Sequence, residues 1–346
     1  MNKKKKIAFF DAKSYDIKSF NDINEKYEIH YFESKLNINT VVLAKGMDVV
    51  CVFVNDDVNK EVLEKLNEYG IGLLALRCAG FNNVDIKAAY KKVHVVRVPA
   101  YSPYAVAEHS MALLLSLNRK VHKAYLRTRE FNFNIQGLTG FDLYKKTIGV
   151  IGTGKIGLAF INICKGFGMN VLAYDPFPRS DIDVEYVNLD RLFKESDIIS
   201  LHCPLTNDTN HIINETSINK MKKGVVIINT SRGGLIDSQA LLSGLQSEKV
   251  LGAALDVYEE EANLFFEDNS SSIIHDDILS LLISLPNVII TSHQGYLTKE
   301  ALENIAQTTL QSVDDYFNGK YLENEVCYHC QVNAKDCMQK RCKNCW

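Results

Sequence analysis

The sequence lacks long apolar runs and a clear excess of either charge. The 346 residues include 39 basic and 42 acidic side chains, a formal net charge of −3. A balance so close to neutral gives no electrostatic reason to expect nucleic acid or an anionic membrane as a partner. No apolar run approaches the roughly 20 residues of a membrane span, and residues 7–10, after the N-terminal lysines, are too few for the core of a signal peptide. We therefore expect a cytoplasmic protein that acts on a small molecule.

Cysteine is scarce in the body of the chain and concentrated at its end. An odd total of nine argues against a secreted disulfide framework. Four cysteines stand singly among apolar residues, where a reduced cysteine behaves as a small buried hydrophobe. These predicted core residues are Cys51, Cys78, Cys164 and Cys203. The other five fall in the last twenty residues.

Two successive series of strands and helices are predicted. Apolar, β-branched runs alternate with segments of helical periodicity over residues 6–100, and a second series begins at Thr147 and ends near residue 291. Uninterrupted apolar strands suit parallel sheets that helices cover on both faces. Residues 104–130 are predicted to form one long helix and residues 299–318 a final amphipathic helix. The pattern predicts an α/β protein with two Rossmann-like or flavodoxin-like units.

A glycine-rich turn follows the first strand of the second series. The apolar strand at 148–151 runs into G-T-G-K-I-G at 152–157, where a helical pattern begins. In such a motif Gly152 permits a tight turn, Gly154 lets the backbone approach a pyrophosphate, and Gly157 lets the helix pack close to the strand. The free amides of the helix N-terminus would then bind the phosphates. The motif predicts a dinucleotide site.

The next strand ends in an acidic residue. Asp175 lies 18 residues after Gly157, where a carboxylate can accept hydrogen bonds from both ribose hydroxyls and repel a 2′-phosphate. The alternative is that Asp175 only caps the turn before Pro176. The order of strand, glycines, helix, strand and acid favours a cofactor site that takes NAD rather than NADP.

Two later strand ends carry groups that could reduce a 2-oxo acid. This chemistry needs a cation for the carboxylate, an acid for the carbonyl oxygen and a group that keeps the acid protonated. Arg232 follows a strand at 225–229 and His293 follows one at 288–290, at the carboxyl ends where open α/β sheets bind ligands. Alone, either residue could be a solvated surface group, so their shared position singles them out. Between them the glutamates at 259–261 could belong to a solvated loop.

The combination resembles the D-isomer-specific 2-hydroxyacid dehydrogenases, and within them the fermentative D-lactate dehydrogenases. The resemblance extends to about residue 325 and rests on residues 77–85, 98–101, 107–109, 152–157, 202–206, 229–237 and 293–302. It implies NAD as cofactor and the reduction of pyruvate to D-lactate by NADH, with other short 2-oxo acids accepted to some degree. The alternative is a non-catalytic NAD sensor on the same fold, as the related transcriptional corepressors are.

The resemblance also implies roles for individual residues. Arg232 would bind and polarise the substrate, and His293 would donate the proton. Glu261, five residues after Asp256, would pair with His293 and keep it protonated, with the two preceding glutamates, Glu259 and Glu260, as fallback candidates. Cofactor contacts are implied for Gly152, Gly154, Lys155, Ile156, Gly157, Asp175, Cys203, Pro204, Thr209, Thr230, Ser231, Arg232 and Asp256. Substrate contacts are implied for the backbone amides of Ala79 and Gly80, for Tyr101 and Tyr296, and for Arg232.

The family's domain order implies a substrate domain at 1–101 and 298–346, with a cofactor domain at 102–297 inserted into it. Catalysis would then occur in the cleft between the domains, which would close over the substrate. The residues after His293 are uncharged, which suits the methyl group of pyruvate better than a phosphate. The long helix from residue 104 is a natural subunit contact, so a dimer or a tetramer is expected.

The sequence departs from the family in its cysteine-rich tail. Two C-x-x-C pairs, Cys327 with Cys330 and Cys342 with Cys345, flank an eleven-residue spacer. Four thiolates so placed can hold zinc, but the spacer is shorter than in the usual structural sites and Cys337 is left over. Nearby basic residues could instead make the thiols redox-sensitive. A reduced, unstructured tail is the third alternative, and no metal site is predicted.

Overall fold

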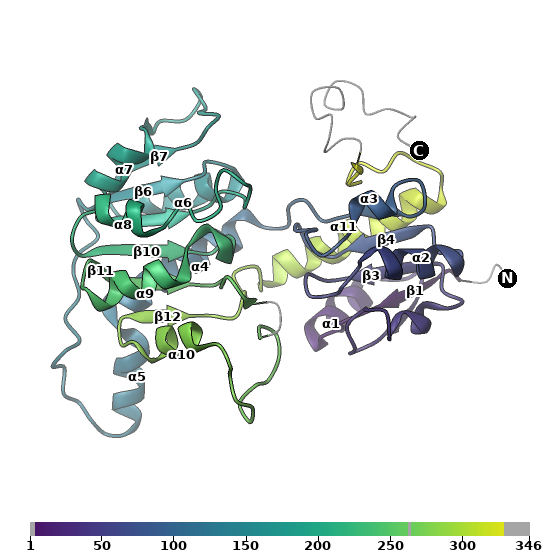
Figure 1. Ribbon diagram of the computed structural model, residues 1–346, viewed down its shortest axis with the longest axis horizontal. Helices are drawn as coiled ribbons and strands as arrows, with labels where there is room; N and C mark the ends of the chain where they lie inside the picture. The colour runs from purple at the N-terminus through teal and green to yellow at the C-terminus, as the bar shows by residue number, and fades with distance from the viewer. Residues whose placement is uncertain (1–3, 262–263, 329–346) are drawn as a thin grey trace. The chain divides into compact units, whose positions relative to one another are not determined.

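The computed structural model describes residues 4–261 and 264–328 (Figure 1). The chain divides into two compact units, Met1–Ser102 with Thr298–Trp346 and, inserted between these segments, Pro103–Leu297. None of the helices in the described ranges is long and apolar enough to cross a membrane.

The first unit is built on a five-stranded parallel sheet. Its strands are β1 (Lys6–Phe9), β2 (Glu28–Tyr31), β3 (Val49–Val52), β4 (Leu73–Leu76) and β5 (His94–Val96). Their order is β2-β1-β3-β4-β5, the doubly wound order of flavodoxin-like folds. The helices are α1 (Ser14–Ile23), α2 (Lys60–Glu68), α3 (Ile86–Ala89) and α11 (Lys299–Phe317), with a 3-10 turn η1 (Val41–Ala44). The predicted strand runs and the final helix are confirmed.

The second unit contains a seven-stranded parallel sheet of order β12-β11-β10-β9-β6-β7-β8. The strands are β6 (Thr147–Ile151), β7 (Asn170–Tyr174), β8 (Glu185–Tyr186), β9 (Ile198–Leu201), β10 (Val225–Asn229), β11 (Val250–Leu255) and β12 (Val288–Ile290). The helices are α4 (Pro103–Arg119), α5 (Val121–Arg129), α6 (Lys155–Gly166), α7 (Leu189–Glu195), α8 (Glu215–Lys220), α9 (Ser238–Gln246) and α10 (Asp277–Ser284), with a 3-10 turn η2 (Gly233–Leu235). The sheet order reverses between β6 and β9, which is where such folds bind ligands.

Both faces of the second sheet are covered, as the apolar strand runs predict. Along β10, Val225 and Ile227 belong to a core cluster shared with α7 to α10, whereas Val226 and Ile228 belong to a cluster shared with α4 and α6. This alternation is the period of two of a β-strand. The expected α/β architecture is confirmed, and it explains why these strands are apolar at every position.

The prediction of one long helix over 104–130 is wrong. The helix breaks at Lys120, whose backbone has φ 51° in the left-handed region, and α5 begins at the next residue. The Lys120 ammonium donates to the carbonyl oxygens of Gly137 and Thr139, which fixes the break. The physical reason lies in burial: α4 packs an apolar face against the sheet, but α5 has no buried residue. The basic second half of the predicted helix, which is α5, therefore has no buried side chain that would keep it collinear with α4.

The body cysteines are reduced and buried, as predicted. This holds for Cys51, Cys78, Cys164 and Cys203. Burial raises the pKa of the Cys51 and Cys164 thiols to about 12 and that of Cys203 to about 11, so all three are protonated at neutral pH. Of the tail cysteines only Cys327 is described, as a buried free thiol. The predictions for Cys330, Cys337, Cys342 and Cys345 concern positions outside the described residues.

Candidate active site and NAD site

The glycine turn joins β6 to α6 at the point where the sheet order reverses. Gly152 has φ 98°, and a Cβ there would lie 2.6 Å from the backbone nitrogen of Cys203, which follows β9. A Cβ on Gly157 would lie 2.0 Å from the carbonyl oxygen of Gly152. Both close approaches require glycine. Gly154, the residue before α6, occupies the N-cap position without a side-chain cap and has no atom within 4 Å of its missing Cβ, so the first turn of the helix is open to a ligand.

Asp175 lies directly beside the glycine turn. Its Oδ2 accepts hydrogen bonds from the Thr153 backbone N–H at 2.8 Å and from the Thr153 hydroxyl at 3.0 Å. Its Oδ1 accepts from the backbone N–H of Phe177 at 2.9 Å, which is the turn cap that the sequence offered as the alternative. One carboxylate thus caps the turn and braces the glycine loop. Its contact with a ribose stays a prediction.

Three adjacent parallel strands bring the remaining candidates to one edge of the second sheet. Asn229 of β10 is paired in register with Leu255 of β11, and Leu255 with Ile290 of β12. Three residues past the end of β10 comes Arg232, the residue after β11 is Asp256, and three residues past β12 comes His293. The order of the strands explains why residues about 60 positions apart in sequence gather at one edge.

His293 is held by two backbone contacts and one carboxylate. Its backbone has φ 50°, and its N–H donates to the carbonyl oxygen of Asp256 at 2.7 Å. Its Nδ1 lies 2.7 Å from Oε1 of Glu261, whose Oε2 accepts from the Tyr258 N–H at 2.9 Å. The ring of Phe266, itself at φ 68°, lies 5.9 Å from the imidazole. The imidazole is therefore fixed on its Nδ1 side, and its Nε2 makes no hydrogen bond with any residue in the described ranges.

The three consecutive glutamates have different environments. Glu261 reaches His293, whereas Glu259 pairs with His211, with 2.5 Å between His211 Nε2 and Glu259 Oε1. Glu260 is exposed and makes no ion pair with the residues that the structure describes. The structure therefore brings only one of these three carboxylates to His293, the one that the spacing from Asp256 selects.

Asp256 is buried, with 1% of its surface exposed, and its carboxylate is saturated with donors. Oδ1 accepts from the Thr291 hydroxyl and the Gln294 N–H, and Oδ2 accepts from the Gly295 N–H at 2.7 Å. Burial alone would raise the pKa of Asp256, but the hydrogen bonds from His109 and Thr291 lower it overall. The carboxylate is ionised and rigid, and it orders the turn that carries His293.

The turn after β10 is braced from both sides. Asn229 donates from its side chain to the Arg232 carbonyl oxygen at 2.8 Å and accepts from the Ser231 N–H at 3.0 Å. The Ser231 hydroxyl donates to the Cys203 carbonyl oxygen at 2.7 Å, which links this turn to the end of β9. Within the described ranges Arg232 forms no ion pair; one guanidinium nitrogen donates to the Ser231 carbonyl oxygen at 2.7 Å. Its charge is available to an anion.

The other predicted cofactor residues surround the same strand ends. The hydroxyl groups of Thr230 and Ser110 are 2.7 Å apart, and the Thr209 hydroxyl donates to the Pro204 carbonyl oxygen at 2.6 Å. Lys155 and Ile156 form the first turn of α6. The thiol of Cys203 is part of the core, so only its backbone faces the glycine turn.

The predicted substrate residues of the first unit follow its strands. Ala79 and Gly80 come after β4, and their carbonyl oxygens accept from Arg97 at 2.7 Å and from the Cys78 thiol at 3.2 Å. Neither N–H donates to another described residue, so both amides are available to a ligand. Tyr101 accepts a hydrogen bond at its carbonyl oxygen from Asn304, at 2.7 Å. Tyr296 belongs to the second unit and is buried.

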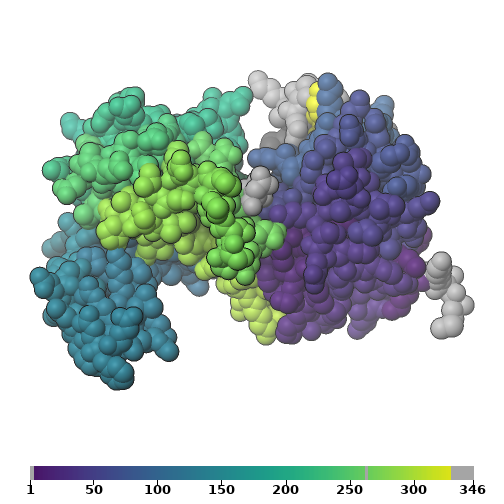
Figure 2. Space-filling view, turned by 60° about the horizontal axis from the view of Figure 1, so that its bottom comes forward, coloured from purple at the N-terminus to yellow at the C-terminus, as the bar shows by residue number. Residues whose placement is uncertain are grey.

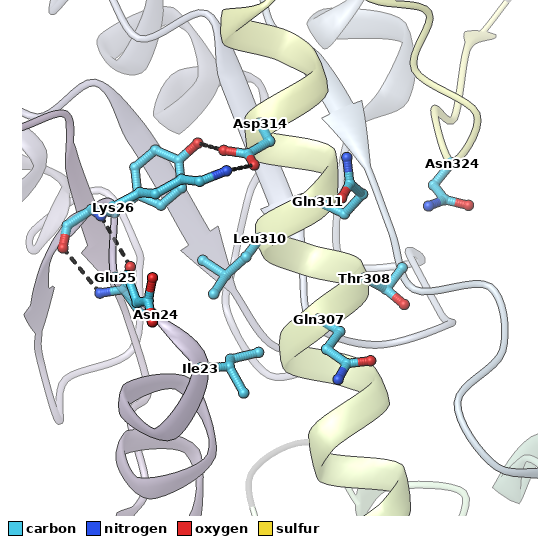
Figure 3. A pocket seen from close by; sticks show the side chains of 11 residues that line it. Ile23, Asn24, Glu25, Lys26, Gln307, Thr308, Leu310, Gln311, Asp314 and Asn324 are labelled. Carbon is cyan, nitrogen blue, oxygen red and sulfur yellow. Dashed lines mark hydrogen bonds and ion pairs between the residues drawn. The ribbon is translucent and has the colours of Figure 1, made fainter.

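A groove of about 570 Å³ in the first unit contains none of the predicted site residues. It is formed by the Ile23–Tyr27 turn and one face of α11 (Figure 3). The carboxylate of Asp314 in its wall is already engaged by the Tyr27 hydroxyl and the Lys26 ammonium. The candidate site is therefore elsewhere, at the strand ends described above.

Comparison with known proteins identifies the family. The sequence model described as "D-isomer specific 2-hydroxyacid dehydrogenase, NAD binding domain" matches residues 111–295, more than half of the chain. The chain belongs to the D-isomer-specific 2-hydroxyacid dehydrogenases. It is an NAD-dependent dehydrogenase, and the matched residues lie in the second unit.

Individual relatives agree over most of the chain. A D-lactate dehydrogenase of Escherichia coli is 50% identical over 327 residues, which cover 93% of this chain and 99% of that protein. A 2-hydroxyacid dehydrogenase homolog of Schizosaccharomyces pombe is 52% identical, over 90% of this chain and 96% of its own. Among solved structures, the apo form of Escherichia coli D-lactate dehydrogenase has a TM-score of 0.86 at 48% identity, covering 93% of this chain and 99% of that chain. An NAD-complexed D-isomer-specific 2-hydroxyacid dehydrogenase of Lactobacillus delbrueckii ssp. bulgaricus has a TM-score of 0.79 at 31% identity and covers 93% and 100% of the two chains.

The residues of this dehydrogenase fit the cofactor that its family binds. The space at Gly154 and the uncapped first turn of α6 suit a diphosphate, because helix N-terminal amides attract anions. Asp175 stands at the end of β7, where a carboxylate can accept from ribose hydroxyls. In the described ranges no group of three or more histidine, cysteine or acidic side chains is arranged to hold a metal ion.

Sequence reasoning missed one contributor to the dehydrogenase site. His109, on α4, has its Nε2 3.2 Å from Oδ1 of Asp256 and 3.1 Å from the Thr291 hydroxyl. It thus ties α4 to the turn that carries His293. Residues 107–109 are one of the segments that carry the family resemblance, so His109 could have been noticed there. A histidine within a helix, however, has no strand-end position that would mark it as functional.

Proposed function

We propose that this dehydrogenase is an NAD-dependent D-lactate dehydrogenase that reduces pyruvate with NADH. The observation that carries the proposal is the His293–Glu261 pair at the edge of the sheet where Arg232 also lies, in the unit that matches the family's NAD-binding domain. Relatives that bear the name D-lactate dehydrogenase, such as the one from Escherichia coli, support the choice within the family.

The side chains supply binding, orientation and the proton. Arg232 binds the carboxylate of pyruvate with its planar guanidinium and polarises the neighbouring carbonyl. NADH, held at the glycine turn and Asp175, would supply the hydride for the carbonyl carbon. The proton for the carbonyl oxygen leaves Nε2 of His293, and the carboxylate of Glu261 stabilises the imidazolium that donates it. The net change is pyruvate, NADH and one proton to lactate and NAD⁺.

The surroundings of His293 favour a small uncharged substrate. Gln294, Gly295 and Tyr296 follow it and bring no cation for a phosphate. Tyr296 is buried, and the preceding residue, Gly295, donates its N–H to Asp256. In the first unit, the backbone amides of Ala79 and Gly80 and the side chain of Tyr101 are proposed as further substrate contacts. The D configuration of the product is the expectation for a member of this family.

The proposed compartment and assembly rest on separate observations. Five free buried cysteines among the described residues fit a reducing compartment, and we place the enzyme in the cytoplasm, where pyruvate reduction would regenerate NAD⁺ in fermentation. A homo-oligomer is supported by the segment from Val121 to Ile135, which Figure 2 shows in blue as a projection of the second unit. Its exposed large apolar side chains are Val121, Tyr125, Leu126, Phe131, Phe133 and Ile135.

A spectrophotometric assay tests the function. NADH oxidation by the purified chain is followed with pyruvate, with longer 2-oxo acids and with a phosphorylated 2-oxo acid, and the enantiomer of the lactate is determined. We expect the highest kcat/KM with pyruvate, and D-lactate as product. His293→Gln should abolish turnover and leave NADH affinity nearly unchanged. Binding of NADH without turnover by the unaltered chain would instead indicate a sensor.

A further inference from the structure

A second acid–imidazole pair lies two residues from the first. Glu259 and His211 are 2.5 Å apart between Oε1 and Nε2, and both side chains are partly buried. The other oxygen of Glu259 accepts from the Ser238 hydroxyl at 2.9 Å and from the Ser238 N–H at 3.3 Å. Glu259 therefore joins the loop before α8 to the first residue of α9. Neither residue has a part in the proposed hydride and proton transfer.

The pair closes a backbone ladder around the Arg232 turn. The His211 N–H donates to the Gly234 carbonyl oxygen at 2.9 Å, and Ile213 exchanges hydrogen bonds with Leu235 and Asp237 at 3.0 and 2.9 Å. The backbone of His211 has φ 50°, a left-handed conformation that costs a non-glycine residue free energy and persists only where the surroundings enforce it.

The loop at 258–261, which follows β11, contacts the Arg232 turn from the other side. A Cβ on Gly233 would lie 2.0 Å from the Tyr258 carbonyl oxygen and 2.5 Å from the Glu259 nitrogen. The residue after Arg232 is thus in direct backbone contact with Glu259. Tyr258, in turn, donates its N–H to Glu261, the partner of His293. One short segment therefore supports the substrate-binding arginine and the proton donor together.

We propose that His211 and Glu259 are positioning residues that fix the Arg232 turn and so aim its guanidinium at the substrate carboxylate. The inference rests on the proposed function, because it presupposes that Arg232 binds a 2-oxo acid. Arg232 itself contacts only the Ser231 carbonyl oxygen through its guanidinium in the described ranges, so its direction depends on the turn beneath it. Loss of the pair should loosen the turn and weaken carboxylate binding.

The test separates substrate binding from chemistry. Initial rates and NADH affinity are measured on the full chain for His211→Ala, Glu259→Ala and the double variant. We expect the KM for pyruvate to rise about tenfold, with kcat changed less than about threefold and the Kd of NADH within about twofold, because uniform binding is lost. The double variant should be no worse than either single one, since the two residues act as a unit.

Two further variants guard against a general loss of structure. His211→Gln retains a side-chain N–H donor and should restore the KM to within about threefold of the unaltered enzyme. Glu260→Gln changes the adjacent exposed carboxylate and should have no effect. Unchanged KM in the alanine variants, or a matching rise in the Kd of NADH, would overturn the positioning role. A complete lack of turnover in the unaltered chain would instead overturn the proposed function itself.

Discussion

The Nδ1 of His293 and the Oε1 of Glu261 lie 2.7 Å apart, and the same carboxylate is anchored at its other oxygen by the Tyr258 N–H. This arrangement leaves Nε2 of the imidazole as the nitrogen that can exchange a proton with a substrate. It also fixes the orientation of the ring, because the carboxylate that contacts Nδ1 is itself held by a backbone N–H.

Removing the carboxylate of Glu261 should impair proton donation by His293. For Glu261→Gln we expect kcat/KM for pyruvate to fall about 100-fold at pH 7, because the amide keeps a hydrogen bond but cannot stabilise an imidazolium. The measurement is kcat/KM for pyruvate at pH 7, with Glu260→Gln as control. A Glu261→Gln variant with the same kcat/KM as the unaltered enzyme would remove Glu261 from the mechanism.

Asp175 should govern the choice between NADH and NADPH. Asp175→Ala removes the carboxylate that would repel a 2′-phosphate, so the ratio of kcat/KM for NADH to that for NADPH should fall at least tenfold. Affinity for NADH should fall as well, because the carboxylate also braces the glycine loop through Thr153. Thr153→Val removes one of these hydrogen bonds but keeps the charge, and it should preserve the preference. An unchanged ratio in Asp175→Ala would mean that another residue selects the cofactor.

The sequence was most informative where burial dictates residue type. The strands of both sheets are apolar because helices cover them on two faces, so β10, buried along its whole length, was predictable. The break in the helix predicted over 104–130 was not predictable. The loss of the apolar stripe after Arg119 shows where burial ends, but it does not show that Lys120 adopts a left-handed backbone. A break of one residue leaves no clear mark in a periodic pattern.

The candidate site was predictable where it follows strand ends and less so elsewhere. Arg232 and His293 stand at equivalent ends of parallel strands, which sequence can show. The selection among three glutamates came from the family's spacing, and only coordinates show that Glu259 faces His211 instead. His109 and His211 lie on a helix and in a loop, and their roles depend on contacts with residues 48 and more positions away. Sequence periodicity does not encode such contacts.

Buried His202 should make the protein less stable in mild acid. Burial lowers its pKa to about 3, and it packs on Phe160 beside the glycine turn. The unfolded chain takes up a proton below about pH 6.5, whereas the folded one stays neutral to about pH 3, so stability is lost as the pH falls through this window. At pH 5 the loss is about 2 kcal/mol. Urea unfolding at pH 7 and pH 5 should show a smaller decrease for His202→Gln, and equal decreases would contradict the assignment.

The exposed apolar segment after α4 should hold subunits together. Phe131 and Phe133 are 84% and 72% exposed, and aromatic side chains grouped this way normally mark an interface. We expect sedimentation to show a dimer or larger for the unaltered chain, and a shift toward monomer for Phe131→Asp combined with Phe133→Asp, because a buried unpaired carboxylate opposes association. Phe177→Asp, at an equally exposed position outside the segment, should leave the assembly intact. A double variant that sediments like the unaltered chain would place the interface elsewhere.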